Sequence, residues 1–336
     1  MITHEIQPGW KAHRDKANEE RSMTGWLVTG GTGLLGANAL LDLQRDGRAL
    51  GVARNVPADA SGGLFVRADL SSRAARSGLV AKMGVDHVLH TAAIATIEGC
   101  ESDPEGAFEL NVRASEDLAA QAYAEDARFI FISTDAVFDG ESGDYAEEDP
   151  TSPISEYGRG KVEAERRVLA ANPDAVVARV NFYGWSPTGT RSLAEFFYNR
   201  LSTDADVGGF TDVKVSTTYV GHLVRAIREL AATDASGIFH VAASHGVSKY
   251  EFGRALAERF GFDPGRVNSV LSTDVLDAPR GADLRLRTDR LRAAIGHDLP
   301  STIAGLRDLQ ADRHAGRPEL LKKFDHNEET HGTFDR

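Results

Sequence analysis

A tyrosine and a lysine four residues apart, Tyr157 and Lys161, are the residues of this chain best suited to moving a proton. We predict that the segment from Ser155 to Lys161 is helical, so that the two side chains share one face. A free tyrosine titrates near pH ~10, and an ammonium a few Å away favours the phenolate, which makes the phenol usable near neutrality. A solvated tyrosine–lysine pair on a helix surface has the same spacing, so the rest of the sequence must decide between a catalytic pair and a surface pair.

A glycine-rich turn follows the first predicted strand, the apolar run from Trp26 to Thr29. Its glycines have the spacing GxxGxxG, and a helix-forming segment, residues 37–43, comes next. Strand, glycine turn and helix together predict a site where a dinucleotide pyrophosphate meets a helix N-terminus, although a turn without a ligand is the alternative. The glycines allow a tight turn, close approach of the phosphates and packing of helix on strand. The expected cofactor-binding residues of this turn are Gly30, Thr32, Gly33, Leu34, Leu35 and Gly36.

The end of the second predicted strand, residues 49–53, indicates which dinucleotide would bind. Arg54 follows this strand directly. An acidic residue at this place would bind a ribose 2′-hydroxyl, whereas an arginine matches a 2′-phosphate. We therefore expect NADP(H) in preference to NAD(H).

Strands and helices alternate along the first half of the chain. Further strands are predicted at residues 64–66, 86–93 and 128–132, with a helix at 104–124 before the last of them. Such βα repeats predict an α/β fold with a doubly wound, Rossmann-like parallel sheet and a ligand at the carboxyl ends of its strands. Thr134, just after the fifth strand, would then lie at the same edge as the tyrosine and the lysine.

Five motifs in this order resemble the extended short-chain dehydrogenase/reductases, over about residues 25 to 312. Within that group, the stretch from Ser133 to Gly140 and the stretch from Glu101 to Pro104 are most similar to the dTDP-4-dehydrorhamnose reductase family of sugar-nucleotide ketoreductases. The five motifs are the glycine turn, Asp69-Leu70, Thr91-Ala92-Ala93, Ser133-Thr134-Asp135 and Tyr157-xxx-Lys161.

The resemblance implies catalytic and cofactor-binding roles. Thr134 would hydrogen-bond the substrate oxygen, Tyr157 would exchange its proton, and Lys161 would hold the nicotinamide ribose while lowering the pKa of the tyrosine. The cofactor positions that it implies besides the glycine turn and Arg54 are Tyr157 and Lys161, Asp69 and Leu70 beside the adenine, and Ala92 and Ala93 beneath the cofactor.

The resemblance also implies four substrate-binding positions: Thr134, Asp135, Asn181 and Phe182. Phe182 stands where the rhamnose enzymes carry a tryptophan, so the sugar platform differs here. A turn asparagine and a core phenylalanine are the alternatives for the last two. The substrate expected from the family is a nucleotide-linked 4-keto-6-deoxy sugar.

The second half of the chain is less regular and predicts a smaller lobe over the substrate. Helices are expected at residues 191–201, 219–232 and 248–260, with a short strand at 238–241. We divide the chain into an N-terminal extension (1–24), an NAD(P)-binding Rossmann domain (25–185), a mainly substrate-binding lobe (186–312) and a polar tail (313–336).

Composition narrows the class of protein and its partners. The net charge of −12 argues against nucleic acid or an anionic membrane as the main partner. Cys100 is the only cysteine, which excludes an intrachain disulfide and a cysteine-based metal site and suits a reducing cytoplasm. The scattered histidines, among them His87 and His90, lack metal-ligand spacing, so no metal is expected. No apolar run approaches ~18 residues, and a homodimer is expected only by analogy with the wider superfamily.

Three functions remain open. The first is a reductase. The second is a dehydratase or an epimerase with tightly held NAD. Dehydratases of this superfamily carry Asp-Glu after the strand-end threonine, whereas this chain has Asp135-Ala136. An epimerase stays possible, although Arg54 argues against bound NAD. The third is a cofactor-binding regulatory subunit, whose usual mark, the loss of Tyr157 or Lys161, is absent.

Overall fold

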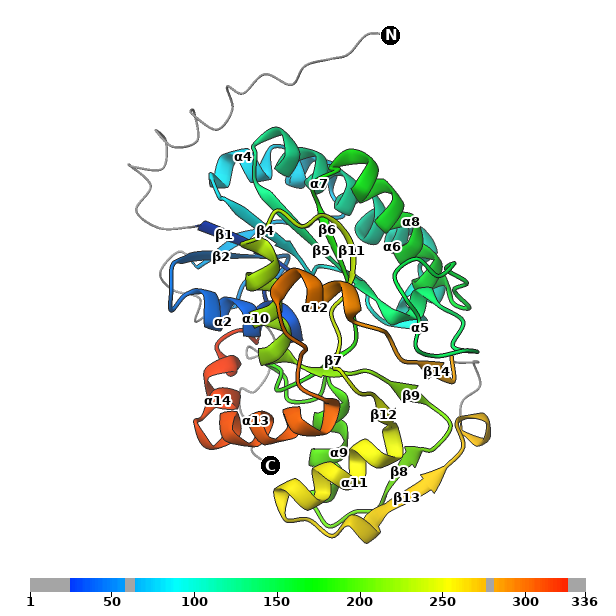
Figure 1. Cartoon of the computed structure of the whole chain (residues 1–336). Helices are drawn as coiled ribbons and strands as arrows, with labels where there is room; N and C mark the ends of the chain where they lie inside the picture. The colour runs from blue at the N-terminus through cyan, green and yellow to red at the C-terminus, as the bar shows by residue number, and fades with distance from the viewer. Residues whose placement is uncertain (1–24, 58–63, 276–280, 326–336) are drawn as a thin grey trace.

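The computed structural model describes residues 25–57, 64–275 and 281–325. Its centre is a seven-stranded parallel sheet in the order β11-β6-β5-β4-β1-β2-β3 (Figure 1). The order reverses between β1 and β4, and such a switch point is where doubly wound sheets bind ligands. The predicted fold class is therefore confirmed. The strands are β1 (Gly25–Thr29), β2 (Arg48–Ala53), β3 (Phe65–Arg67), β4 (His87–His90), β5 (Arg128–Thr134), β6 (Val176–Val180) and β11 (Gly237–His240).

Both faces of the sheet are covered by helices, which explains why its strands are apolar on both sides. In β5, Phe129 and Phe131 belong to one core cluster, whereas Ile130 and Ile132 belong to the other. The first cluster includes α4 (Leu79–Met83), α7 (Ala114–Ala124) and α8 (Glu156–Ala171), and the second includes α2 (Leu34–Leu43) and α10 (Val220–Ala231).

The helix expected at residues 104–124 has three parts. It begins as α6 (Pro104–Phe108), widens into a π-helical turn at Glu109–Arg113 and continues as α7. Asp103 caps the start of α6, since its Oδ1 accepts a hydrogen bond from the amide of Gly106 at 2.9 Å. Shorter helices precede it: α3 (Arg73–Arg76) and α5 (Ile97–Ser102).

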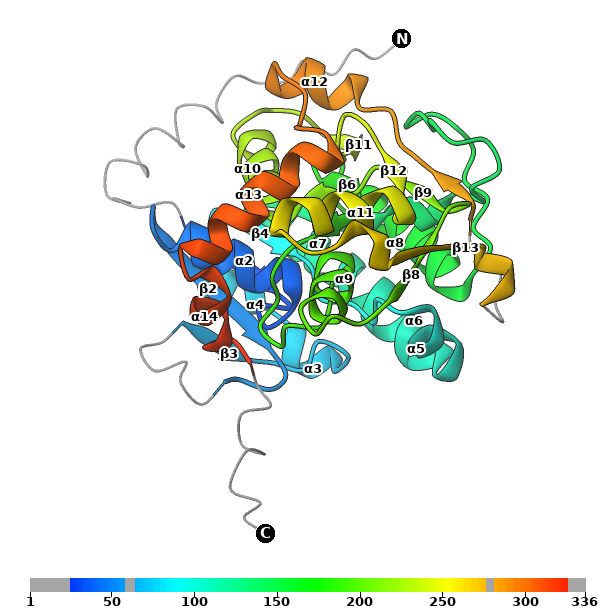
Figure 2. The same ribbon diagram turned by 90° about the horizontal axis from the view of Figure 1, so that it is seen from below.

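The lobe built from the second half of the chain lies beyond the carboxyl ends of the sheet strands (Figure 1). Its small sheets pair β7 with β10, β8 with β13, and β9 with β12 and β14. Figure 2 shows α9, α11 and α13 together on this side of the molecule. The bounds are β7 (Phe182–Tyr183), α9 (Leu193–Leu201), β8 (Val207–Phe210), β9 (Lys214–Val215), β10 (Thr218–Tyr219), β12 (Val247–Ser248), α11 (Lys249–Phe260), β13 (Val267–Val270), β14 (Asp283–Leu284), α12 (Asp289–Ile295), α13 (Thr302–His314) and α14 (Arg317–Lys322).

The prediction of a polar tail from residue 313 is wrong for residues 313–325. Arg317 at the start of α14 is buried, and its guanidinium forms a 2.9 Å ion pair with Asp42 of α2. Leu321 and Phe324 are fully buried in the main core. The polar average of the segment concealed these two apolar side chains, one near the end of α14 and one in the turn after it. The predicted extension (1–24) and residues 326–336 lie outside the described residues.

No helix among the described residues has the length and apolar character needed to cross a membrane.

Candidate active site

The carboxyl end of β5 presents Thr134 at the sheet edge. A 3₁₀ turn, Asp135–Val137, follows, and the Thr134 hydroxyl accepts a hydrogen bond from the amide of Ala136 at 3.2 Å. The same hydroxyl donates to Oδ1 of Asp135, also at 3.2 Å. Thr134 is thus fixed by its own turn, with one remaining acceptor position.

The first turn of α8 packs closely on this turn. Ser155 caps the helix by accepting a hydrogen bond from the amide of Gly158 at 3.1 Å. A Cβ on Gly158 would lie 2.4 Å from the carbonyl oxygen of Ala136, so only glycine allows this approach. The contact brings the hydroxyl of Tyr157 close enough to that of Thr134 for the threonine to affect the tyrosine's pKa.

Burial governs the protonation of the tyrosine and the lysine. Burial raises the pKa of Tyr157, and Thr134 acts in the opposite direction. Lys161 is 3% exposed; its Nζ donates to the carbonyl oxygen of Ile132 at 2.8 Å and lies 4.6 Å from the ring centroid of Phe131. Burial lowers the pKa of Lys161 to about 8, so the ammonium is the main form at neutral pH. The expectation that Lys161 lowers the pKa of Tyr157 is not met: burial raises this pKa, and the opposing contribution comes from Thr134.

Two of the predicted substrate positions meet beside Thr134. The side-chain amide of Asn181 donates to Oδ2 of Asp135 at 2.7 Å, and Asp135 is 4% exposed. Burial raises the pKa of Asp135 to about 6 despite this bond. Phe182 is half-buried and packs against the main core cluster, as the alternative of a core phenylalanine predicts.

The glycine turn after β1 has the geometry that a dinucleotide requires. Gly30 has φ +67°, and a Cβ there would lie 2.9 Å from the backbone of Ala92. A Cβ on Gly36 would lie 2.2 Å from the carbonyl oxygen of Gly30. Gly33 caps α2 without a side-chain hydrogen bond, and the first helical turn holds no acidic residue. The amides of the first turn are therefore suited to an anion, and the turn fits a pyrophosphate.

The other residues of this turn are divided between core and surface. Leu35 is buried in the main core, whereas Thr32 and Leu34 are half-buried. The carbonyl oxygen of Thr32 accepts a hydrogen bond from Arg191 at 3.4 Å, which links the turn to the loop before α9.

The segment after β4 is tied to the turn by Thr29. Its Oγ1 accepts hydrogen bonds from the amides of Thr91 at 3.1 Å and Ala92 at 3.2 Å. His90 is fully buried, with Nδ1 2.7 Å from Thr29 Oγ1 and Nε2 2.9 Å from Ser115 Oγ, and burial lowers its pKa to about 3. These bonds place the half-buried Ala92 and Ala93 beside the glycine turn.

The ends of β2 and β3 hold the remaining cofactor candidates. Arg54 is exposed at the end of β2. Hydrogen bonds from Ser71 lower the pKa of Asp69, and the charge of Arg54 contributes to the same effect. Leu70 is buried in the core against α4 and α7.

A buried ion pair beneath the site was not predicted from the sequence. Glu165 of α8 and Arg179 of β6 are joined by a 2.8 Å bond between Oε2 and Nη2. The one available signal was the position of Glu165, one turn after Lys161 in the same helix.

A family model described as the RmlD substrate binding domain matches residues 23–313. The chain belongs to this family. The predicted resemblance to the dTDP-4-dehydrorhamnose reductases, within the extended short-chain dehydrogenase/reductases, is therefore confirmed.

The relatives include proteins named as reductases and proteins named as subunits of another enzyme. The chain is 32% identical over 291 residues to a probable low-salt glycan biosynthesis reductase of Haloferax volcanii, covering 85% of this chain and 97% of that protein. It is 29% identical over 288 residues to the methionine adenosyltransferase 2 subunit beta of Rattus norvegicus, covering 82% and 84%. The first relative is named as an enzyme and the second as a subunit.

The fold is also that of solved family members. A dTDP-4-dehydrorhamnose reductase of Bacillus anthracis, in complex with NADP, has a TM-score of 0.77 at 21% identity, covering 86% of this chain and 99% of that one. At this identity the similarity establishes the fold alone.

Proposed function

We propose that this RmlD-family protein uses NADPH to reduce a 4-keto-6-deoxy sugar carried on a nucleotide. The observation that carries the proposal is the convergence of Thr134, Tyr157 and Lys161 at the switch point of the sheet, next to a turn that fits a pyrophosphate. Membership of the family and the reductase named among the relatives support it.

The residues of the site have complementary tasks in this reaction. NADPH, when bound, supplies the hydride. Tyr157 is protonated at neutral pH because burial raises its pKa, so it can give its proton to the oxygen of the reduced carbonyl. The Thr134 hydroxyl, held by its turn, would orient that oxygen by turning its hydrogen from Asp135 toward it. The Lys161 ammonium would bind the ribose beside the nicotinamide.

The preference for NADP(H) rests on Arg54, which is exposed at the end of β2 and close enough to Asp69 to affect its pKa. An exposed guanidinium at this edge suits a 2′-phosphate. The remaining substrate contacts are assigned to Asp135 and Asn181, whose hydrogen bond forms a polar wall beside Thr134.

The test is oxidation of NADPH, followed by absorbance, with dTDP-4-keto-6-deoxy sugars as substrates and NADH as the comparison cofactor. We expect turnover with NADPH in the wild type and a loss of at least about 100-fold in kcat for Tyr157→Phe, since general acid catalysis contributes ~10²–10⁴-fold. The variant should still bind NADPH, which serves as the folding control.

The subunit among the relatives supports a second candidate, a cofactor-binding regulatory subunit. The same assay separates the two. Binding of NADPH without turnover of any keto-sugar nucleotide, in wild type and Tyr157→Phe alike, would reject the reductase and favour the subunit.

A further inference from the structure

The ion pair between Glu165 and Arg179 is buried beneath the candidate active site. The side chains of Glu165 and Arg179 are only 5% and 3% exposed. Arg179 approaches both carboxylate oxygens of Glu165, with Nε 3.0 Å from Oε1 and Nη2 2.8 Å from Oε2. The hydroxyl of Ser133 donates to Oε1 at 2.5 Å. Glu165 thus joins three elements, since Ser133 belongs to β5 and Arg179 to β6.

This carboxylate is placed to act on Lys161. The two residues are one helical turn apart on α8, where positions i and i+4 are neighbours. Lys161 donates to the carbonyl oxygen of Ile132, and Glu165 accepts from Ser133, the next residue of β5. Two successive residues of β5 are therefore bonded to two successive turns of α8, immediately before Thr134.

Charge as well as geometry links the two side chains. Burial disfavours an ammonium, and it lowers the pKa of Lys161 to about 8, while the negative charge of Glu165 acts in the opposite direction. A buried ion pair adds little to stability compared with apolar side chains of similar size. Its charge is thus better explained by an effect on a neighbour than by an effect on folding.

We propose that Glu165 is a positioning residue, whose charge keeps Lys161 an ammonium and whose bonds hold α8 against the end of β5. The inference rests on the proposed role of Lys161 in binding the cofactor and does not depend on the identity of the sugar.

Other groups face this pair from the elements packed around it. Arg179 has its Nη1 3.5 Å from Nε2 of His240 and lies 5.1 Å from the ring centroid of Phe138. The backbone amide of His240 donates to Glu147, a second buried carboxylate. Cys100 acts to raise the pKa of Lys161, and the charge of Lys161 acts to lower the pKa of His90.

The test is the dissociation constant of NADPH, measured by fluorescence from about pH 6 to about pH 10, a range that spans the titration of a buried lysine. In the wild type we expect affinity to fall as the pH rises through the Lys161 pKa of about 8. In Glu165→Gln the midpoint of this fall should move down by about one pH unit, because an attractive charge is removed. Glu165→Asp, which keeps the charge, should retain the wild-type midpoint.

Glu147→Gln is the matched control. It neutralises a buried carboxylate of the same cluster that does not contact Lys161, so the midpoint should not move. If Glu165→Gln does not fold, the double variant Glu165→Met with Arg179→Met removes the pair without leaving a buried charge, and its midpoint should also fall.

Three results would overturn the inference. The first is a Glu165→Gln or double variant that loses stability but keeps the wild-type midpoint, which would make the role purely structural. The second is an equal shift in Glu165→Asp or Glu147→Gln. The third is a wild type that binds no NADPH at any pH, which would reject the cofactor role as well and is thereby distinguishable from the other two.

Discussion

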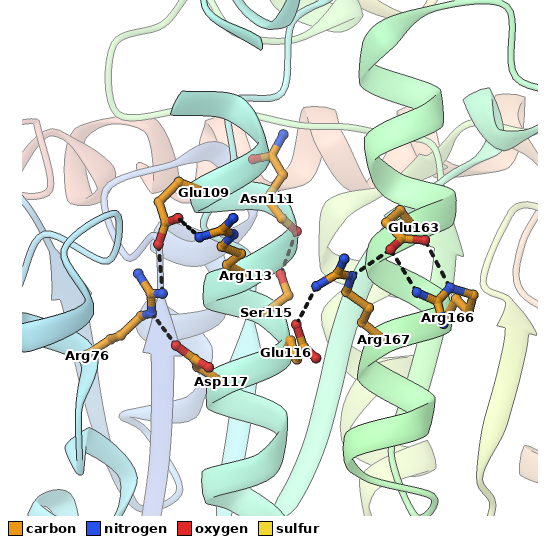
Figure 3. A network of polar contacts seen from close by, with 10 residues as sticks. All are labelled: Arg76, Glu109, Asn111, Arg113, Ser115, Glu116, Asp117, Glu163, Arg166 and Arg167. Atoms are coloured by element: carbon orange, nitrogen blue, oxygen red, sulfur yellow. Dashed lines mark hydrogen bonds and ion pairs between the residues drawn. The ribbon is translucent and has the colours of Figure 1, made fainter. Parts of the chain in front are cut away.

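Two glutamates of α8, Glu163 and Glu165, lie two residues apart and face opposite environments. Positions i and i+2 point about 200° apart around a helix. Glu163 faces outward and is paired with Arg166 at 2.8 Å and Arg167 at 2.6 Å, in a network that reaches α7 (Figure 3). Glu165 faces inward and is paired with Arg179 beneath the site.

The outer network is extensive but solvated. Its members are partly exposed, from 29% for Arg167 to 66% for Arg166, and Arg167 continues to Glu116 of α7 at 2.9 Å (Figure 3). Exposed pairs contribute only about 0–1 kcal/mol each, because water and salt screen them and the side chains lose freedom. The number of ion pairs on a face is therefore a poor guide to its contribution to stability. Burial decides how much the free energy of unfolding falls when one partner is removed.

The largest difference between the faces should follow from removing an arginine. Arg179→Met leaves Glu165 buried without its cation, and we expect a loss of about 3–5 kcal/mol in the free energy of unfolding. Arg167→Met, on the outer face, should cost far less, because its ion pairs are solvated. Urea unfolding of both variants measures the contrast, and similar losses in the two would remove the distinction between the faces.

An intermediate difference is expected for the glutamates themselves. Glu165→Gln should cost about 1–3 kcal/mol, because it weakens bonds to a buried guanidinium, and Glu163→Gln about 0–1 kcal/mol. Unfolding repeated at about 1 M salt, where the Debye length is ~3 Å, should abolish the effect at Glu163 and leave that at Glu165. A salt-sensitive effect at Glu165 would show that water reaches the inner pair.

The smallest expected effect is the change with acid pH in the stability contributed by Glu163. Hydrogen bonds from Arg166 and Arg167 lower the pKa of Glu163 from 4.5 to about 2. A carboxylate whose pKa is depressed by folding stabilises the protein above its unfolded pKa and loses that effect as the pH falls through the folded one. The small stability difference between wild type and Glu163→Gln should therefore vanish between about pH 4.5 and about pH 2. A difference that persists below this range would assign it to packing instead of charge.

Short-range sequence patterns predicted much of the site. The turn from Gly30 to Gly36 could be predicted because its glycines are required by local backbone geometry. The meeting of Thr134 and Tyr157 followed from the rule that parallel strands end at one edge. The assignments to cofactor and substrate remain predictions.

Long-range features could not be predicted in the same way. Glu165 lies among charged residues in a helix whose neighbours Glu163 and Arg166 are solvated, so its type and spacing do not distinguish it. Arg179 occurs within an apolar strand, and nothing in the sequence of that strand indicates which residue pairs with it. Spacing alone does not decide between a substrate contact and a core position for Phe182, which packs with the core, nor does the polar composition of residues 313–325 reveal α14.

The sequence by itself therefore determined the elements, their order and the residue types able to transfer a proton, because these depend on backbone propensity and on spacing within a few residues. Only the tertiary structure decided which charges are buried. The protonation of Tyr157 and Lys161 follows from burial, and burial depends on how α8 packs against β5 and β6, which spacing within a few residues does not specify.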